Sequence, residues 1–337
     1  MKFSFAAAAA SPLLRQLVLY TALAVSPASA LAGDSKGTFT LALENDLFAA
    51  GSDSHYTHGT EIAYVSDTYM PGWMDSVLGV LPFHRDGDDA RISWSLGQQM
   101  YTPADLDSTA LIVDDRPYAG WTYTSLGVLS ESQHDSKRHV DILELIVGIV
   151  GPDSGAEKTQ RAIHKILDSD RPRGWDNQLG NEITADLRYQ RKWAWPLIDN
   201  RIDVLPFGSF TLGSSQRRAS AGFTFRVGSG LNADYGPPLI HPKEGSSSYF
   251  KASQVFYWYL FIGAQGEFVD YNIFLDGNRD GDSHSVDREE WIGNIQAGAV
   301  VGAGNWRISL TNLFLSREFK TQDEPDEYGS IAVSYRF

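Results

Sequence analysis

A short amphipathic segment carries a histidine that could act as a general base. Ser154 and Glu157 have the spacing of a capping box, which predicts a helix with Ser154 as its N-cap. Gln160, His164 and Asp168 recur every four residues, so this helix would place them on one polar stripe. An imidazole presented in this way can deprotonate water. The alternative is a solvated surface histidine, which the residues alone favour.

Carboxylate and amide oxygens gather where an early strand is expected to end. Glu44, Asn45 and Asp46 close this strand, and Tyr56-Thr57-His58-Gly59 opens the next one. Hard oxygen ligands of this kind suit Ca²⁺. EF-hand spacing is absent, which excludes a calcium loop of that type. Polar turn residues that cap a hairpin are the alternative, and the residues alone favour this alternative too.

Three further loop segments have unusual compositions. The run 114–121 (DDRPYAGW) combines two acids, an arginine and two aromatics, and arginine is well suited to binding a phosphate. A plain turn would also explain its proline and glycine. The run 276–282 (DGNRDGD) resembles a calcium loop in composition, but turns favour the same residues. The serines of 246–248 lie in a Gly/Ser-rich stretch that we interpret as a linker.

Several other chemistries are excluded or unsupported. The 337 residues include no cysteine, which excludes a thiol nucleophile, a disulfide scaffold and a Cys-ligated zinc site. No G-x-S-x-G, H-E-x-x-H or Walker motif is present. The net charge of −14 argues against a nucleic-acid partner, because phosphates would repel the chain.

The elements that must position these residues are predicted to be strands. At the carboxyl end, Ile331, Val333, Tyr335 and Phe337 alternate with polar residues, as in a half-buried strand. Thirteen segments qualify as strands: 37–46, 58–66, 91–101, 119–131, 138–150, 181–193, 201–213, 217–229, 252–263, 265–275, 289–302, 304–317 and 328–337. A closed antiparallel barrel needs an even number, so one boundary must be wrong. The division at Gln265-Gly266 has the least support.

The amino terminus predicts export. Small residues near Lys2 and Arg15, an apolar run from Leu17 to Val25 and A-x-A sites indicate a signal peptide over 1–32, cleaved after Ala30 or Ala32. The apolar run is too short for a membrane-spanning helix, which needs about 20 residues.

The mature chain, 33–337, is expected to be a single outer-membrane domain. It is rich in glycine (31 residues) and in aromatics (9 Trp, 15 Tyr and 17 Phe), as such barrels are. We predict an all-β fold: a transmembrane antiparallel β-barrel of about twelve strands with a short helix in an extracellular loop. If the chain starts in the periplasm, the connections 47–57, 102–118 and 151–180 face outward.

Several motifs, taken together and in order, resemble those of a known family. They are Glu44-Asn45-Asp46, Tyr56-Thr57-His58-Gly59, Asp115-Arg116-Pro117-Tyr118-Ala119-Gly120, Gln160-x3-His164, Gly174-Trp175-Asp176-Asn177-Gln178-Leu179, Phe274-Leu275-Asp276-Gly277-Asn278 and Asp282-Ser283-His284-Ser285-Val286. The chain from about 37 to 337 is similar to the lipid A deacylase LpxR family of outer-membrane 3′-O-deacylases.

This resemblance implies a twelve-stranded barrel that removes the 3′-acyloxyacyl group of lipid A with Ca²⁺ as cofactor. It implies a mechanism similar to that of secreted phospholipase A₂, with His164 as the base that activates water and Gln160 as its neighbour. Asn45 and Asp46 match the Asn-Asp pair of the metal and oxyanion site. Thr57 matches the active-site threonine.

The resemblance also suggests contacts with the substrate. Arg116 would contact a lipid A phosphate, and the acidic residue after the histidine matches either Asp168 or Asp170. His58 departs from the pattern, where asparagine is expected, and this puts metal affinity in doubt. The expected partners are lipopolysaccharide and outer-membrane lipids, with no nucleic acid, and we expect a monomer. The alternatives are an outer-membrane phospholipase with a serine nucleophile and a non-catalytic porin-like barrel.

Overall fold

The computed structural model describes most of the chain beyond the predicted leader. The described residues are 37–48, 55–67, 78–79, 82, 84–85, 88–134, 137–167, 172–241, 243, 247–281 and 283–337. The predicted signal peptide and its cleavage site lie outside these ranges, so both stay predictions. Within the described ranges, no helix is both long and apolar enough to cross a membrane.

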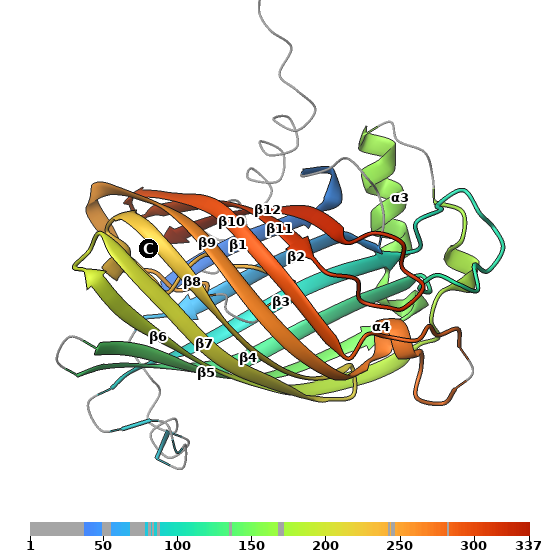
Figure 1. The fold of residues 1–337 in the computed structure, drawn as a ribbon, viewed down its shortest axis with the longest axis horizontal. Coiled ribbons are helices and arrows are strands. Elements are labelled where there is room, and N and C mark those ends of the chain that lie inside the picture. The colour runs from blue at the N-terminus through green and yellow to red at the C-terminus, as the bar shows by residue number, and fades with distance from the viewer. Residues whose placement is uncertain are drawn as a thin grey trace, which may run out of the picture.

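Twelve antiparallel strands close into a barrel, and β1 pairs with β12 to complete it (Figure 1). The strands are β1 Gly37–Asn45, β2 His55–Ser66, β3 Asp89–Thr102, β4 Ala119–His134, β5 Lys137–Val150, β6 Glu182–Ile198, β7 Ile202–Gly213, β8 Gln216–Ser229, β9 Ser253–Asn272, β10 Trp291–Gly304, β11 Trp306–Leu315 and β12 Asp326–Arg336. Each strand pairs with its neighbours in sequence. The predicted fold class is therefore confirmed.

The thirteenth predicted strand was wrong. Segments 252–263 and 265–275 form one continuous strand, β9, which is followed by the short helix α4, Ile273–Asp276. Gln265 and Gly266 stay in the ladder because β8 and β10 pair with them on both sides. A glycine weakens an isolated strand, but here the backbone hydrogen bonds of two neighbouring strands hold it.

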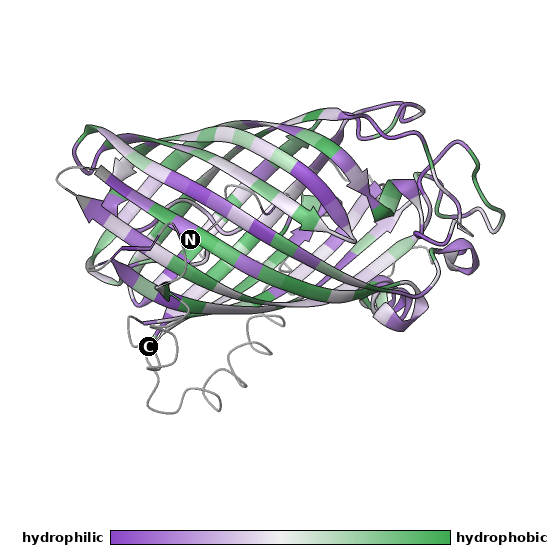
Figure 2. Ribbon diagram, turned by 90° about the horizontal axis from the view of Figure 1, so that it is seen from below, coloured by the Kyte–Doolittle hydropathy of each residue, from purple (hydrophilic) through white to green (hydrophobic). Residues whose placement is uncertain are grey.

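The barrel wall is apolar outside and polar inside, as the alternation along each strand predicts. Figure 2 shows this alternation on the strands. Exposed apolar side chains cover the outer face, among them Leu96, Leu126, Leu145, Ile183 and Leu260. Buried ion pairs line the inner face, such as Arg218 with Glu267 at 3.1 Å.

The chain between β8 and β9 enters the barrel from the end that carries the carboxyl terminus, and its described residues are 230–241, 243 and 247–252. Tyr235, Ile240 and Phe250 of this lumenal segment are almost fully buried. Ser247 and Ser248 of the predicted linker at 246–248 belong to it, and Ser247 is buried rather than solvated, whereas Ser246 lies outside the described residues. We call these described residues the lumenal segment below.

The helices lie at the opposite end of the barrel (Figure 1). They are η1 Asp46–Phe48, η2 Pro152–Ser154, α3 Ala156–Leu167, η3 Trp175–Asn177 and α4; η4 Leu231–Ala233 belongs to the lumenal segment. The predicted helix exists, but its predicted N-cap was wrong. Ser154 ends η2, and Gly155, with a φ of 71°, lies between the two helices. Ser154 still accepts a hydrogen bond from the backbone N–H of Ala156 at 3.3 Å.

Candidate active site between the barrel wall and helix α3

Helix α3 is attached to the outer face of the barrel wall. Gln98 on β3 and Thr122 on β4 point outward, and both donate hydrogen bonds to the carbonyl oxygen of Ser154, at 2.8 and 2.7 Å. These two bonds satisfy the carbonyl at the turn that enters α3. The helix therefore starts from a fixed point on the wall.

Gly120 on β4 allows the helix to approach this closely. A Cβ atom at position 120 would lie 2.2 Å from the Cβ of Ala156 and 2.3 Å from the Oγ of Ser154. Such distances are too short for any van der Waals contact, so a larger residue must push the start of α3 away from the wall.

We expect Gly120→Val to displace α3 while the barrel stays folded, because only the outer face of β4 is changed. Limited proteolysis should then cut 151–181 faster than in the unchanged protein. Gly266→Val is the matched control, since nothing lies within 4 Å of a Cβ there. Equal cleavage in the two variants would contradict the steric role of Gly120.

A buried cluster also packs against the start of α3. Met100, Tyr118, Ala156 and Trp175 pack together, and the indole Nε1 of Trp175 donates to the Oε1 of Gln160 at 2.7 Å. The Nε2 of Gln160 is buried and has no hydrogen-bond partner among the described residues. Gln160 is thus oriented by Trp175 and keeps two N–H donors available for a ligand.

Trp175 was absent from the predicted site residues. The Gly174-Trp175 pair that follows the helix in sequence was the available signal. Gly174 is needed because a Cβ there would lie 2.4 Å from the ring of Tyr118. The contact between Trp175 and Gln160 could not be read from their spacing, because a contact between a helix and a residue 15 positions further on depends on how the chain folds back after the helix.

The ends of β1 and β2 form the wall side of the site. The side chain of Asn45 donates to the carbonyl oxygen of Thr57 at 2.7 Å, and the hydroxyls of Thr57 and Thr102 are 2.7 Å apart. The pairing of β2 with β3 shifts between Tyr56 and His58, so Thr57 is the extra residue of a β-bulge. Bulges of this kind redirect side chains beside active sites.

Asp46 directly follows the last residue of β1. It is the first residue of η1, and its side chain is buried, with 1% of the residue exposed.

The histidine of α3 meets this wall. His58 is the cross-strand partner of Asn45 and lies close enough to His164 for the two imidazoles to interact electrostatically. Both rings are buried. The expectation of a solvated His164 is therefore not met. Asn45, Thr57, Gln160 and His164, which are far apart in the sequence, lie in one region between the wall and α3.

A groove beside these residues opens on the outer face of the barrel. It has a volume of about 460 Å³ and runs between β2, β3, β4 and α3. Its lining includes His58, Ile62, Leu96, Thr159, Ala162 and Ile163. The groove is thus mainly apolar, with a histidine at its polar end.

Arg116 lies elsewhere. Its guanidinium is fully buried, donates to Glu318 at 2.9 Å and lies over the ring of Tyr101. Burial is the largest influence on Glu318 and would raise its pKa, but the positive charge and hydrogen bond of Arg116, together with the nearby His241 and Arg218, lower the pKa overall. The partner of Arg116 is a carboxylate rather than the expected phosphate, so we leave it out of the proposed site. Asp168 and Asp170 lie outside the described residues.

Metal ligands can be tested against the same geometry. No cluster of three or more His, Cys, Asp or Glu side chains that could hold a metal occurs in the ranges described. In the 276–282 run, Asp276 accepts from Arg288 at 2.5 Å, and the side chain of Asn278 bonds the backbone of Gly180. That loop therefore anchors the connection after α3. Asp46 and Asn45 supply adjacent hard oxygens, which fit Ca²⁺ if backbone, water or substrate oxygens complete the shell.

Comparisons with known proteins agree on one relationship. The family described as "Outer membrane protein LpxR" matches residues 17–337. Among solved structures, LpxR from Salmonella typhimurium is similar with a TM-score of 0.70 and 19% identity, covering 89% of this chain and 100% of that one. The β domain of the Bordetella autotransporter BrkA has a TM-score of 0.44 and 10% identity, covering 90% and 99%. Curated proteins gave no significant match.

Proposed function

The chain belongs to the LpxR family of outer-membrane proteins, and from this premise we propose that it is a lipid A 3′-O-deacylase with its active site between the barrel wall and α3. Outer-membrane barrels have longer loops on the extracellular side, which assigns the α3 end to the cell exterior. The substrate would be lipid A, whose acyl chains lie in the adjacent outer leaflet.

One observation carries this proposal: the site opens on the lipid-facing wall and not on the lumen. The groove beside His58 and His164 is lined by Ile62 and Leu96 of the wall and by Ala162 of α3. An acyl chain can slide from the bilayer into this groove without leaving an apolar environment. Its ester would then lie near the polar end, where the buried imidazoles are.

The proposed reaction is hydrolysis of the 3′-ester. His164 accepts a proton from a water molecule as the water oxygen bonds to the ester carbonyl carbon. The tetrahedral intermediate collapses with cleavage of the bond to the 3′ oxygen, and His164 returns the proton to that oxygen. The products are the acyloxyacyl fatty acid and lipid A with a free 3′-hydroxyl.

The negative charge on the carbonyl oxygen needs donors that are already in place. We assign this role to the Nε2 of Gln160, which is buried, oriented through Trp175 and without another partner in the described chain. Asn45 and Thr57 would hold the wall side of the site, because the amide of Asn45 is fixed on the backbone of Thr57.

Calcium is proposed as the cofactor, held by Asp46 with the side-chain oxygen of Asn45. When bound, it would supply positive charge next to the developing oxyanion. A cation would also help an acidic protein to bind an anionic glycolipid. His58 stands beside Asn45 in this arrangement, and imidazole is a less suitable calcium ligand than an amide oxygen.

The two alternatives have less support from the geometry. Among the described residues, Ser130 and His84 form a Ser–His hydrogen bond of 2.9 Å, but Ser130 lies near the periplasmic end of β4. A porin needs an open lumen, whereas the lumenal segment occupies this one.

The proposal is tested by mass spectrometry of lipid A from cells that express the protein. We expect lipid A to lose its 3′-linked acyloxyacyl group, and Ser130→Ala to leave this loss intact. Release of phospholipid acyl chains that Ser130→Ala abolishes would favour the serine phospholipase instead. Unmodified lipid A, with the folded protein present and calcium added, would reject the deacylase.

A further inference from the structure

We propose that the lumenal segment positions the catalytic end of β1 from inside the barrel, through the carboxylate of Glu44. This inference rests on the proposed function, because it assigns Asn45 and Asp46 to the active site. It makes Glu44 a positioning residue that never touches the substrate. Under this proposal, a segment that connects two strands on the periplasmic side affects the rate of a reaction at the outer surface.

The contact itself is specific. Glu44 is fully buried and faces the lumen, and its two oxygens accept the backbone N–H groups of Ile240, at 2.8 Å, and His241, at 2.9 Å. The hydroxyl of Tyr56 donates to the same carboxylate at 2.9 Å. Three donors thus meet at one carboxyl group, which joins β1, β2 and the lumenal segment at one point.

Aromatic packing holds Ile240 and His241 in place. We call these two residues the tip of the lumenal segment. The imidazole of His241 lies 4.8 Å from the ring of Tyr56, and the hydroxyl of Tyr328 on β12 donates to the carbonyl of His241. Gly59 leaves room for this arrangement, because a Cβ there would lie 2.2 Å from the Tyr56 hydroxyl. The residues from Tyr56 to Gly59 therefore make contacts inside the lumen as well as on the outer wall.

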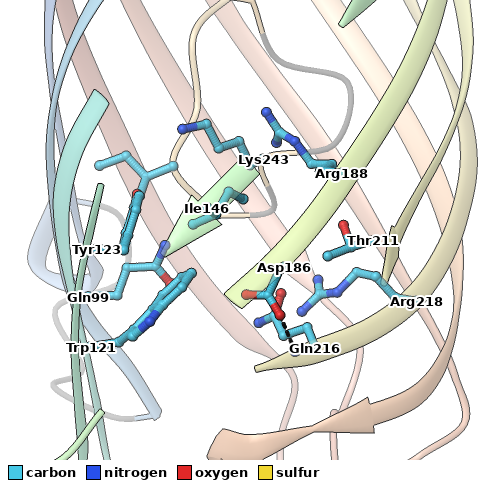
Figure 3. Close-up of a pocket in the computed structure, with 11 residues that line it drawn as sticks. Gln99, Trp121, Tyr123, Ile146, Asp186, Arg188, Thr211, Gln216, Arg218 and Lys243 are labelled. Carbon is cyan, nitrogen blue, oxygen red and sulfur yellow. Dashed lines mark hydrogen bonds between the residues drawn. The ribbon is translucent and has the colours of Figure 1, made fainter. Parts of the chain in front are cut away.

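The rest of the lumenal segment is tied firmly to the wall. Asp234 pairs with Arg226 at 2.5 Å, and Lys251 pairs with Glu131 at 3.1 Å. Figure 3 shows Lys243 of this segment among the side chains that line a lumenal cavity, with Tyr123 to one side of it and Arg188 to the other. The cavity that these side chains line measures about 30 Å³, room for about two water molecules. The tip therefore has little freedom to move away from Glu44.

A displacement of Glu44 would also move Asn45, because the two residues are adjacent in β1. Their side chains point to opposite faces of the wall, as those of neighbouring strand residues do. Glu44 faces the lumen, so Asn45 faces the outer site, where it bonds the bulge at Thr57. Tyr56, whose hydroxyl donates a hydrogen bond to Glu44, directly precedes this bulge. A shift of Glu44 would displace both sides of the proposed oxyanion and metal site, and misplacement by about 1 Å can lower a rate by about 10²-fold.

The test compares variants on the inner face of β1 and at the tip. Glu44→Ala should lower kcat by about 10²-fold, with little change in KM because the outer groove is untouched. Glu44→Gln should lower kcat less than Glu44→Ala does, because one acceptor oxygen remains in the glutamine side chain. Thr40→Ala is the matched control: Thr40 lies on the same strand and face, and its hydroxyl lies 2.9 Å from that of Ser334 on β12, so kcat should stay unchanged.

The tip is tested through its backbone. Ile240→Pro removes the N–H that Glu44 accepts and should lower kcat, whereas Ile240→Ala keeps this N–H and should not. Heat-modifiable electrophoretic mobility checks that each barrel is folded.

Hydrogen–deuterium exchange of 44–48 and 55–60 separates this inference from the proposed function. Faster exchange in Glu44→Ala than in Thr40→Ala would support the positioning role even if the wild type deacylates nothing. Unchanged exchange, or unchanged kcat in Glu44→Ala and Ile240→Pro where the wild type is active, would overturn it.

Discussion

Replacing His164 with alanine is expected to lower the rate of lipid A deacylation by about 10²–10⁴-fold, the usual contribution of a general base. The proposed mechanism uses His164 twice, to take the proton from water and to return it to the leaving 3′ oxygen. Helix α3, Ala156–Leu167, contains no second histidine that could replace it as the base. His58 lies on the wall, where its Nε2 is 2.7 Å from the Oγ1 of Thr60.

The measurement is single-turnover hydrolysis of purified lipid A in detergent, with the product identified by mass spectrometry. Folding of the variant is checked by its heat-modifiable electrophoretic mobility. His139→Ala is a suitable control, because His139 lies near the periplasmic end of β5, paired with Ser132 and Trp193. Activity of His164→Ala close to that of the wild type would exclude His164 as the base and with it the proposed mechanism.

Removal of calcium should have an effect of similar size. We expect a chelator to abolish deacylation and added Ca²⁺ to restore it. Asp46→Asn should lower the rate by about 10²–10³-fold, as the loss of one oxyanion-stabilising group does. Asp46 is the only acid that we place in the site, and asparagine keeps its shape but removes its charge.

Metal binding can be measured apart from activity, by titrating Ca²⁺ into the folded barrel in a calorimeter. Asp280→Asn is the matched control, because Asp280 belongs to the calcium-like run 276–282, which we interpret as an anchor. Asp46→Asn should lose the binding heat and Asp280→Asn should keep it. The reverse result would move the calcium site to the β9–β10 connection. Full activity in chelator would show that the reaction needs no metal.

The barrel was predictable because its signal is local. Alternation along each strand depends only on which residues face lipid and which face the lumen, and this pattern located every strand of the ladder. The one extra strand, which arose from the division at Gln265-Gly266, came from treating a glycine as a break. Backbone pairing with β8 and β10 decided otherwise, and no property of the residues themselves reports such pairing.

The motifs named most of the candidate site residues but not how those residues are arranged. Asn45, Thr57, Gln160 and His164 came from motifs, and they lie together in the structure. Arg116 did not join them. An arginine in a polar loop suits a phosphate equally well by its chemistry, and only the nearby carboxylate of Glu318 shows which partner it has.

The sequence by itself determined the fold class, and its motifs named Asn45, Thr57, Gln160 and His164, which the structure brings together. These follow from patterns within about a dozen neighbouring residues. Only the tertiary structure decided that α3 packs on the outer wall at Gly120, and that the lumenal segment reaches Glu44 across 196 residues of chain. Such contacts depend on side-chain volume and on hydrogen-bond partners distant in sequence, which become neighbours only when the barrel closes.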